Sequence, residues 1–449
     1  MEKWEETVIS DTTFDFHSYS DYSLPKPENL DGCEENLDQI CSSSGQPVKK
    51  RRLTQKNLFQ LWGLENTNHG RIDLHHQLGR RRSTSFNINH KTGKSETATS
   101  LASRKDQRLC PFYKRIPGTP FTVDAFCYGP VKGCSVYFLS HFHADHYIGL
   151  TKGWSHGPIY CTNLTARLLR ICLNVSPSFI CPMELGTEYS LKGIKVTMLD
   201  ANHCPGAALI HFRLPNGQCY LHTGDFRASK MMQSYPLLAS QRINILYLDT
   251  TYCNPKYRFP SKEDVLEFVV GVTRRYLSNQ PKTIVVVGAY SIGKEHVYFA
   301  ISKALGVKIY ANASRRRILR SFGWAGISEN LSTKGKDTPL HILPISSLRF
   351  EVLQRYLASQ HGQYTDMLAF RPTGWTYSEN IGENLNLIKP ATKGNITIYG
   401  VPYSEHSNFT ELQEFVQFLR PEKIIPTVNV GKAVNRAKMQ SYFQQWLKA

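Results

Sequence analysis

The sequence lacks both the long apolar runs of a membrane protein and the paired cysteines of a disulfide scaffold. In its 449 residues, no stretch approaches the roughly 18 apolar residues that a membrane-spanning helix needs. Residues 1–10 lack the apolar core of a signal peptide. The 11 cysteines are odd in number and contain no CxxC pair. We therefore expect an intracellular chain with reduced cysteines, no membrane segment and no zinc finger.

Acidic residues are too few to balance the basic ones. The chain has 36 Asp and Glu against 54 Lys and Arg, which gives a formal net charge of +18 and a pI near 9.4. Such an excess favours a polyanionic partner, either nucleic acid or an acidic membrane face. A generally basic, solvated surface is the alternative that charge alone leaves open.

Apolar periodicity is scarce in residues 1–109, which we expect to be a disordered tail. Composition changes within this tail, from acidic and Ser-rich to basic, at the KKRR run of residues 49–52. The run fits a nuclear localisation signal and predicts a protein of the nucleus. The alternative is a solvated basic tail that touches nucleic acid.

One apolar island interrupts the tail, from Gln55 to Trp62. It is similar to the peptide that docks on the sliding clamp of replication, with a glutamine, an aliphatic residue and then a bulky pair. It departs from that peptide at Leu61, where an aromatic residue is usual. The alternative is an isolated hydrophobic spot in a disordered segment.

From Cys110 onward the sequence has the pattern of a folded α/β protein. Apolar runs predict strands at 136–139, 194–199, 207–214, 218–222 and 243–248, and a Pro-Asn-Gly turn predicts a hairpin between the third and fourth. Strands then alternate with helices, which indicates a parallel sheet. In this part we predict helices at 261–277, 294–305, 347–359, 409–419 and from 435, strands at 283–287, 307–310, 366–370, 395–399 and 423–430, and a turn at 371–375.

Three imidazoles and a carboxylate follow the first of these strands within six positions. They are His141, His143, Asp145 and His146. Imidazole nitrogen and carboxylate oxygen together suit zinc, and a ligand set that leaves positions open is the catalytic kind. The alternative is a surface histidine cluster in a polar turn.

Three more loops carry a ligand-type residue directly after a strand. They contribute His203, Asp225 and His406. Each loop by itself is also typical of an ordinary hydrogen-bonded turn. Together they make a set that can hold two metal ions with a shared carboxylate, the arrangement that activates water and stabilises both the attacking and the leaving oxygen.

Several stretches of this sequence resemble one family. The HxHxDH cluster, the histidine loop and the TGD loop are similar to the metallo-β-lactamase fold, and the insertion after Asp249 that returns at His406 resembles its β-CASP branch. The sequence motifs are most similar to those of the DNA cross-link repair nucleases, the group containing Artemis and Apollo, and within that group to those of the interstrand cross-link repair 5′ exonuclease. The matching stretches are FYKRIPGTPFTVDAF (112–126), LDANHCPG (199–206), LHTGDFR (221–227), LDTTYC (248–253), YSIGKE (290–295), AFRPTGW (369–375) and PYSEHS (402–407).

The resemblance implies an αββα metallo-β-lactamase sandwich with an inserted β-CASP α/β domain. The sandwich would comprise residues 110–252 and a closing part at 394–449. The inserted domain would comprise residues 253–393.

The resemblance also implies a ligand set. One metal would be held by His141, His143, His203 and Asp225, and the second by Asp145, His146, Asp225 and His406. The metals would be zinc, with magnesium or manganese as alternatives at the second site. Supporting residues that orient the ligands would be Asp124, Asp200, His222 and Asp249.

The activity that the resemblance implies is 5′-to-3′ exonuclease action on DNA with a 5′-phosphate end. Asp225 would bridge the metals, and Asp145 or His406 would deliver a proton to the leaving 3′ oxygen. The loop before a predicted helix is a candidate phosphate site, because backbone N–H groups and the helix dipole favour anions there. The candidate phosphate and DNA contacts are Ser291, Gly293, Lys294, Arg371, Thr373 and Ser404, and Arg315, Arg316 and Arg317 are a further candidate DNA contact or a solvated helix face.

One more absence bears on the substrate. RNA-cleaving β-CASP enzymes carry another histidine in the strand after the His406 loop, whereas no histidine follows His406 here. This favours DNA. The remaining alternatives are a DNA endonuclease of the same fold, a small-molecule hydrolase, which would need neither the insertion nor the basic charge, and a non-catalytic repair scaffold, which the complete ligand set disfavours.

Overall fold

The computed structural model describes residues 109–377, 382 and 384–448. The predicted localisation signal at 49–52 and the clamp-binding segment from Gln55 to Trp62 lie outside these residues. Within the described ranges, every helix is too short or too polar to span a bilayer.

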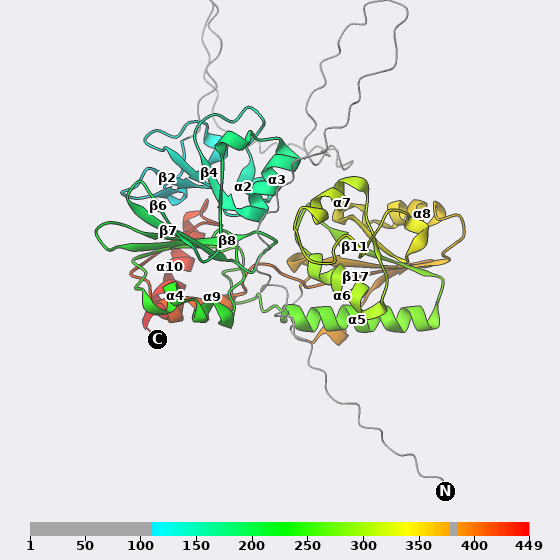
Figure 1. The fold of residues 1–449 in the computed structure, drawn as a ribbon. Coiled ribbons are helices and arrows are strands. Elements are labelled where there is room, and N and C mark those ends of the chain that lie inside the picture. The colour runs from blue at the N-terminus through cyan, green and yellow to red at the C-terminus, as the bar shows by residue number, and fades with distance from the viewer. Residues whose placement is uncertain (1–108, 378–381, 383, 449) are drawn as a thin grey trace, which may run out of the picture. The chain divides into compact units, whose positions relative to one another are not determined.

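Two sheets form the first part of the fold (Figure 1). The 5-stranded sheet has the order β1-β2-β3-β4-β5, and the 6-stranded sheet has the order β18-β10-β9-β8-β7-β6. β6 to β9 pair antiparallel, whereas β9, β10 and β18 pair parallel. The strands are β1 (Arg115–Ile116), β2 (Phe121–Val123), β3 (Val136–Phe138), β4 (Ile159–Thr162), β5 (Ile180–Met183), β6 (Glu188–Leu191), β7 (Ile194–Asp200), β8 (Ala208–Arg213), β9 (Cys219–His222), β10 (Ile245–Leu248) and β18 (Lys423–Pro426).

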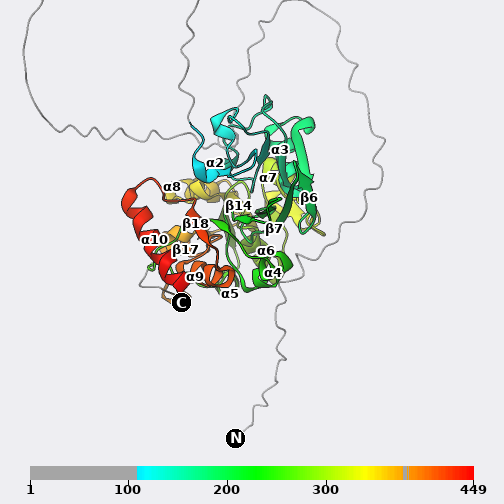
Figure 2. The ribbon, with the colours of Figure 1, turned by 90° about the vertical axis from the view of Figure 1, so that its left-hand side faces the viewer.

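Alternation along the strands sends apolar side chains to both faces of each sheet. Ile210 and Phe212 of β8 pack against Phe138 of the other sheet, whereas Leu209 belongs to the core on the opposite face. Helices cover those outer faces: α3 (Asn163–Leu173) contacts β4, and α10 (Ala433–Lys448) contacts β18 and α9 (Phe409–Leu419), beside which it lies in Figure 2. The predicted αββα sandwich is therefore confirmed.

A 7-stranded sheet of order β13-β12-β14-β11-β15-β17-β16 forms the inserted part. All its pairs are parallel except β16 with β17. Its elements are α5 (Lys262–Asn279), β11 (Thr283–Ala289), α6 (Glu295–Leu305), β12 (Ile309–Tyr310), α7 (Ala313–Arg320), β13 (Leu331–Ser332), β14 (Leu340–Pro344), α8 (Phe350–Ala358), β15 (Asp366–Pro372), β16 (Ala391–Lys393) and β17 (Ile396–Val401).

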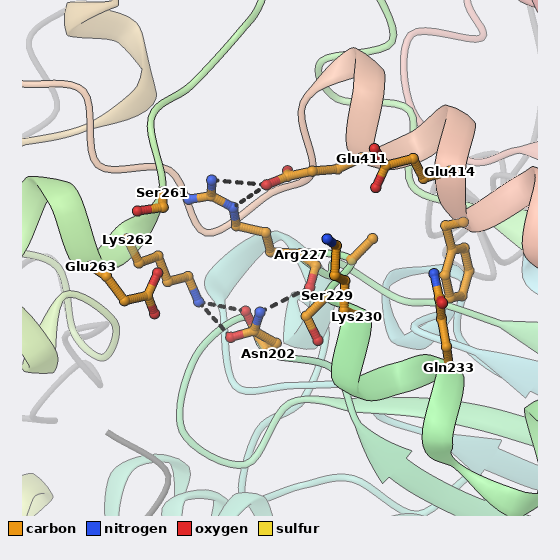
Figure 3. A pocket seen from close by; sticks show the side chains of 12 residues that line it. Asn202, Arg227, Ser229, Lys230, Gln233, Ser261, Lys262, Glu263, Glu411 and Glu414 are labelled. Carbon is orange, nitrogen blue, oxygen red and sulfur yellow. Dashed lines mark hydrogen bonds and ion pairs between the residues drawn. The ribbon is translucent and has the colours of Figure 1, made fainter. Parts of the chain in front are cut away.

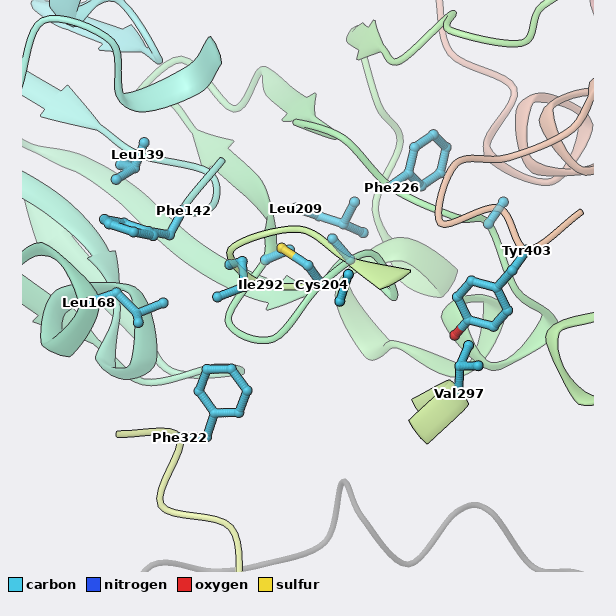
Figure 4. Close-up of a cluster of buried hydrophobic side chains, with 14 of the residues drawn as sticks. Leu139, Phe142, Leu168, Cys204, Leu209, Phe226, Ile292, Val297, Phe322 and Tyr403 are labelled. Atoms are coloured by element: carbon cyan, nitrogen blue, oxygen red, sulfur yellow. The ribbon is translucent and has the colours of Figure 1, made fainter. Parts of the chain in front are cut away.

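Both faces of this sheet are buried, as a parallel sheet requires. Val285 and Val287 of β11 pack with α5 and α6, whereas Ile284 and Val286 pack with α8 on the other face. One core cluster runs on from here into the sandwich, and Figure 4 shows its members Phe142, Cys204 and Ile292. The predicted α/β insertion is confirmed.

The observed helix starts agree closely with the predicted ones, whereas some of the observed strand ends differ from the predicted ones. Ser261 caps α5 by accepting from Asp264 N, and α9 has the predicted bounds. β18 ends at Pro426 instead of residue 430, because the Thr250 hydroxyl takes both backbone groups of Val428.

Two predicted boundaries in the inserted part also need correction. The turn predicted at 371–375 starts late, since Arg371 and Pro372 pair with Gly400 and Val401 as the end of β15. β17 therefore belongs to the inserted sheet, and we place the return to the sandwich after Val401 instead of at residue 394.

Phe212→Ala should lower the free energy of unfolding by about 3–5 kcal/mol, because it removes a fully buried ring from between the two sheets. Phe112→Ala is the matched control, since that ring is 71% exposed and its loss should change stability by less than about 0.5 kcal/mol. Urea unfolding followed by circular dichroism measures both. Equal midpoints for the two variants would contradict the packing described.

Candidate metal centre

The predicted ligands lie in loops that leave the ends of strands. His141 and His143 occupy the turn between β3 and α2 (Ala144–Tyr147), and Asp145 and His146 lie in α2 itself. The other three come from the loops after β7, β9 and β17. The structure brings six of the seven into three overlapping groups, within each of which the ligand atoms lie within 4.8 Å of one another: His141, His143 and His203 with Cys204, His141 and His146 with Asp225, and His203 with Asp225 and His406.

Three imidazole nitrogens meet at one point. Nε2 of His141 lies 2.9 Å from Nδ1 of His143, which lies 3.1 Å from Nε2 of His203. His141 and His203 are buried. Burial, together with the neighbouring imidazoles, holds the pKa of both well below the usual value, and burial lowers that of His143 as well. All three rings are therefore neutral.

Hydrogen bonds on the far side of each ring fix where its one proton lies. Nε2 of His143 faces the Ile292 carbonyl, and Nδ1 of His203 faces the Glu405 carbonyl at 2.7 Å, and a carbonyl can only accept. Nδ1 of His141 faces the Ser140 hydroxyl, which already donates its proton to Asp124.

Every proton is thus on the outer nitrogen, and three lone pairs face one another. A neutral nitrogen lone pair cannot donate to its neighbour, so the arrangement is repulsive unless a cation lies between them. Imidazole donors at this spacing suit a tetrahedral divalent ion such as zinc. The residues present therefore fit a metal ion.

A carboxylate oxygen joins these three histidines, the first group, to a second group, which we define as Asp225, His146 and His406. Oδ2 of Asp225 lies 3.7 Å from Nε2 of His141, 3.9 Å from Nε2 of His203 and 3.2 Å from Nε2 of His146. His406 belongs to the same group as His203 and Asp225. One oxygen therefore faces both groups, as the predicted bridging role requires.

The two histidines of the second group are held by buried carboxylates. Nδ1 of His146 lies 2.7 Å from Oδ2 of Asp124, and Nδ1 of His406 lies 2.8 Å from Oδ2 of Asp249. Burial opposes a charge on His146, but the carboxylates of Asp225 and Asp124 outweigh it and raise its pKa well above the usual value. This group of acids therefore favours a positive charge, supplied by protons or by a metal ion.

Asp145 stands apart from the other ligands. Its side chain is 79% exposed, and its Oδ2 lies 3.5 Å from Nε2 of His146. Its exposed carboxylate thus lies beside a ligand histidine and outside the three groups.

The predicted supporting residues have different roles. Asp124 and Asp249 each hold a ligand histidine. His222 supports a ligand indirectly, since its Nδ1 accepts from Gly224 N beside Asp225. Asp200 accepts from Asn202 N at 2.7 Å, so it shapes the loop that carries His203 and contacts no ligand in the described part of the chain.

The His203 loop is also braced by a buried lysine. Nζ of Lys262 donates to both the carbonyl and the side-chain oxygen of Asn202, each at 2.7 Å, and Asn202 has a left-handed backbone with φ of 50°. Figure 3 shows this contact at the wall of a cavity of about 420 Å³, which Arg227 and its ion pair with Glu411 also line.

Three residues of the site escaped the sequence reasoning. Ser140 joins Asp124 to His141, and Cys204 lies in the three-histidine group, where burial raises the pKa of its thiol well above the usual value. The third is Glu405, in the motif PYSEHS directly before His406. A ligand-type residue directly beside a predicted ligand was the available signal for both Glu405 and Cys204.

The loop predicted to bind phosphate holds the Glu405 carboxylate instead. Oε1 of Glu405 accepts from Lys294 N at 2.9 Å, and Oε2 accepts from Lys294 Nζ at 2.7 Å. Gly293 has a φ of 93°, and a Cβ there would lie 2.9 Å from Oε2 of Glu405. The anion that the loop binds in the structure is therefore internal, and the buried Lys294 is already paired.

Most of the remaining candidate phosphate contacts also bind partners within the protein. Ser404 is buried and bonds both backbone groups of His406, Thr373 accepts from Trp375 N, and Arg371 donates to the Leu348 carbonyl. Ser291 is partly exposed. Of the three candidate arginines in α7, Arg315 is buried, Arg316 donates to the Ala311 carbonyl and Arg317 is exposed.

Asp249→Asn should weaken metal binding by roughly 10- to 100-fold, because an amide holds the His406 ring less firmly than a carboxylate does. The matched control is Asp200→Asn, whose contact to Asn202 N an amide oxygen preserves. Competition with a chromogenic chelator measures the affinity of each purified variant for zinc. Equal losses in both variants would contradict the roles assigned here.

Glu405→Gln and Lys294→Met should each lower the free energy of unfolding by about 3–5 kcal/mol, because each leaves the other charge buried and unpaired. The double variant should recover part of that loss, since no buried charge remains. A double-mutant cycle from denaturant unfolding measures the coupling. Strictly additive losses would show that the pair does not act as a unit.

Comparisons with known proteins show the family of this chain. Residues 325–432 match the family model described as DNA repair metallo-beta-lactamase. The chain is 63% identical over 412 residues to the DNA cross-link repair protein SNM1 of Arabidopsis thaliana, covering 89% of this chain and 85% of that protein.

Two more distant relatives come from Gallus gallus. The DNA cross-link repair 1A protein is 48% identical, over 79% of this chain and 36% of that protein, and 5′ exonuclease Apollo is 35% identical, over 70% and 63%. The chain thus spans about a third of the cross-link repair 1A protein. The metallo-β-lactamase fold and its histidine and aspartate cluster identify the site as one for divalent metal ions. The chain belongs to the DNA repair metallo-β-lactamase family, together with the cross-link repair protein SNM1.

Proposed function

We propose that this protein is a metal-dependent deoxyribonuclease of DNA cross-link repair that removes nucleotides from 5′-phosphorylated ends in the 5′-to-3′ direction. The names of its relatives support this, since they include two cross-link repair proteins and a 5′ exonuclease. The basic charge of +18 is suited to a polyanionic substrate.

The observation that carries the proposal is the single Asp225 oxygen that lies between Nε2 of His141 and of His203 on one side and Nε2 of His146 on the other. Divalent ions bound in such a pair of sites supply Lewis acidity, which activates water and offsets the charge of a phosphodiester in its transition state. Zinc is the ion that the imidazole donors of the first group favour. The second group, richer in carboxylates, also suits magnesium or manganese.

The protein's own residues position the reaction. Asp124 and Asp249 hold Nδ1 of His146 and of His406, and Nε2 of His146 lies 3.2 Å from the Asp225 oxygen. Asp145 is the exposed acid of the centre, and either Asp145 or His406, whose Nδ1 is held by Asp249, would deliver a proton to the leaving 3′ oxygen.

The 5′-phosphate contact needs residues that are not already paired. Ser291 fits best among the predicted candidates, because it is partly exposed and opens the loop that binds the Glu405 carboxylate. Such a loop, which precedes α6, is suited to anions by its backbone N–H groups.

DNA is favoured over RNA because no histidine follows His406. We also propose nuclear location and contact with the sliding clamp. These two proposals depend on the basic run at 49–52 and the segment from Gln55 to Trp62 in the sequence.

The test of the proposed activity is digestion of a DNA oligonucleotide labelled at its 3′ end. The wild-type protein should give a ladder of shortening products from a 5′-phosphorylated strand and much less from a 5′-hydroxyl strand. Asp145→Ala should abolish the ladder, whereas Asp200→Asn should preserve it, because Asp200 contacts no ligand among the described residues. Internal cuts indifferent to the 5′ end would indicate an endonuclease, and no metal-dependent cleavage would indicate a scaffold.

A further inference from the structure

An aromatic cluster lies directly beside the metal centre. We define it as Tyr252, Tyr257, Phe259, Trp375 and Tyr377. The ring of Tyr252 meets that of the ligand His406 edge-on at 5.9 Å between centroids, and it meets Trp375 at 5.8 Å and Phe259 at 4.8 Å. Tyr377 packs on Phe259 at 5.2 Å. Tyr252 therefore connects an imidazole of the site to Trp375 on the surface.

The cluster has a buried base and an exposed tip. Tyr252 is 4% exposed, whereas Trp375 is 73% exposed, which is unusual for so large an apolar side chain. The position of Trp375 is nevertheless fixed by its surroundings. Its backbone N–H donates to the Thr373 hydroxyl, and a Cβ on Gly374 would lie only 2.5 Å from the Tyr252 hydroxyl. Glycine thus lets the Trp375 loop approach Tyr252 closely.

Basic side chains alternate with the aromatic ones in this cluster. Lys256 and Arg258 flank Tyr257 in the sequence YCNPKYRF and are exposed. Nζ of Lys256 lies 4.7 Å from the centre of the Tyr257 ring. A surface that combines exposed aromatic faces with cations is the kind that binds a single nucleic-acid strand, since bases stack on the rings and phosphates pair with the cations.

We propose that the aromatic cluster is a stacking platform for an unpaired base of the DNA strand that enters the metal centre. Trp375 supplies the stacking face, Tyr252 and Phe259 anchor it, and Lys256 and Arg258 meet the strand's phosphates. The occupant is a base and not a separate partner, because one ring alone stands between Trp375 and the ligand His406. This inference rests on the proposed nuclease function and names how that site holds its substrate.

The test is a double-mutant cycle that combines one substitution in the protein with the removal of one base from the DNA. Single-stranded oligonucleotides carry one abasic residue at each of the first six positions from the 5′ end in turn. Their binding to the full-length, metal-loaded Asp145→Ala protein is measured by fluorescence anisotropy, with and without Trp375→Ala. Trp375→Ala should weaken binding of the intact strand by roughly 5- to 100-fold, the usual effect of losing one base–aromatic stack.

The same substitution should have no effect when the abasic residue lies at the position that stacks. Trp375→Phe should retain most of the affinity, because it keeps an aromatic face. Phe112→Ala, which removes an equally exposed ring that contacts Tyr113, should bind like the parent.

Two outcomes would contradict the proposal that the aromatic cluster stacks a base. One is unchanged binding by Trp375→Ala, and the other is an equal loss for intact strands and for every abasic strand, which would make Trp375 structural. Failure of the nuclease function is a separate result, because it appears as absence of DNA cleavage by the wild-type protein in the labelled-strand assay.

Discussion

Three imidazole lone pairs that face one another are the constraint on which the rest of the structure depends. Such an arrangement is unfavourable by itself, and the protein enforces it by giving each outer nitrogen an acceptor: Ser140, the Ile292 carbonyl and the Glu405 carbonyl. The acceptors come from distant parts of the chain, so the folded sandwich and its insertion are both needed to build the first group. A bound cation would replace the repulsion between these lone pairs with attraction, so that metal binding stabilises the fold.

Glu405 shows how closely site and fold are joined. Its carbonyl orients His203, its carboxylate binds Lys294 at the start of α6, and the next residue is the ligand His406. A displacement of the inserted sheet would therefore be felt directly by two ligand histidines. This also explains why the loop before α6 has the features of a phosphate site while an internal carboxylate fills it.

Much of this could be predicted from the sequence, and the failures have a common physical cause. Ligand-type residues that follow apolar runs pointed to the candidate site, because the runs themselves are visible in the local sequence, and the helix that Ser261 caps was predicted from its local sequence as well. The partner of Lys294 lies 111 positions away and had no local signal. The end of β18 was missed because apolar residues continue past Pro426, whereas the Thr250 hydroxyl takes both backbone groups of Val428 and Asn429 has a left-handed backbone.

The most direct test of the central claim is a crystal structure of the zinc-loaded protein with anomalous data collected at the zinc absorption edge. The account predicts a peak within bonding distance of Nε2 of His141, Nδ1 of His143 and Nε2 of His203, because those are the nitrogens without protons. Zinc bound through Nε2 of His143, or no peak among these three nitrogens, would contradict it.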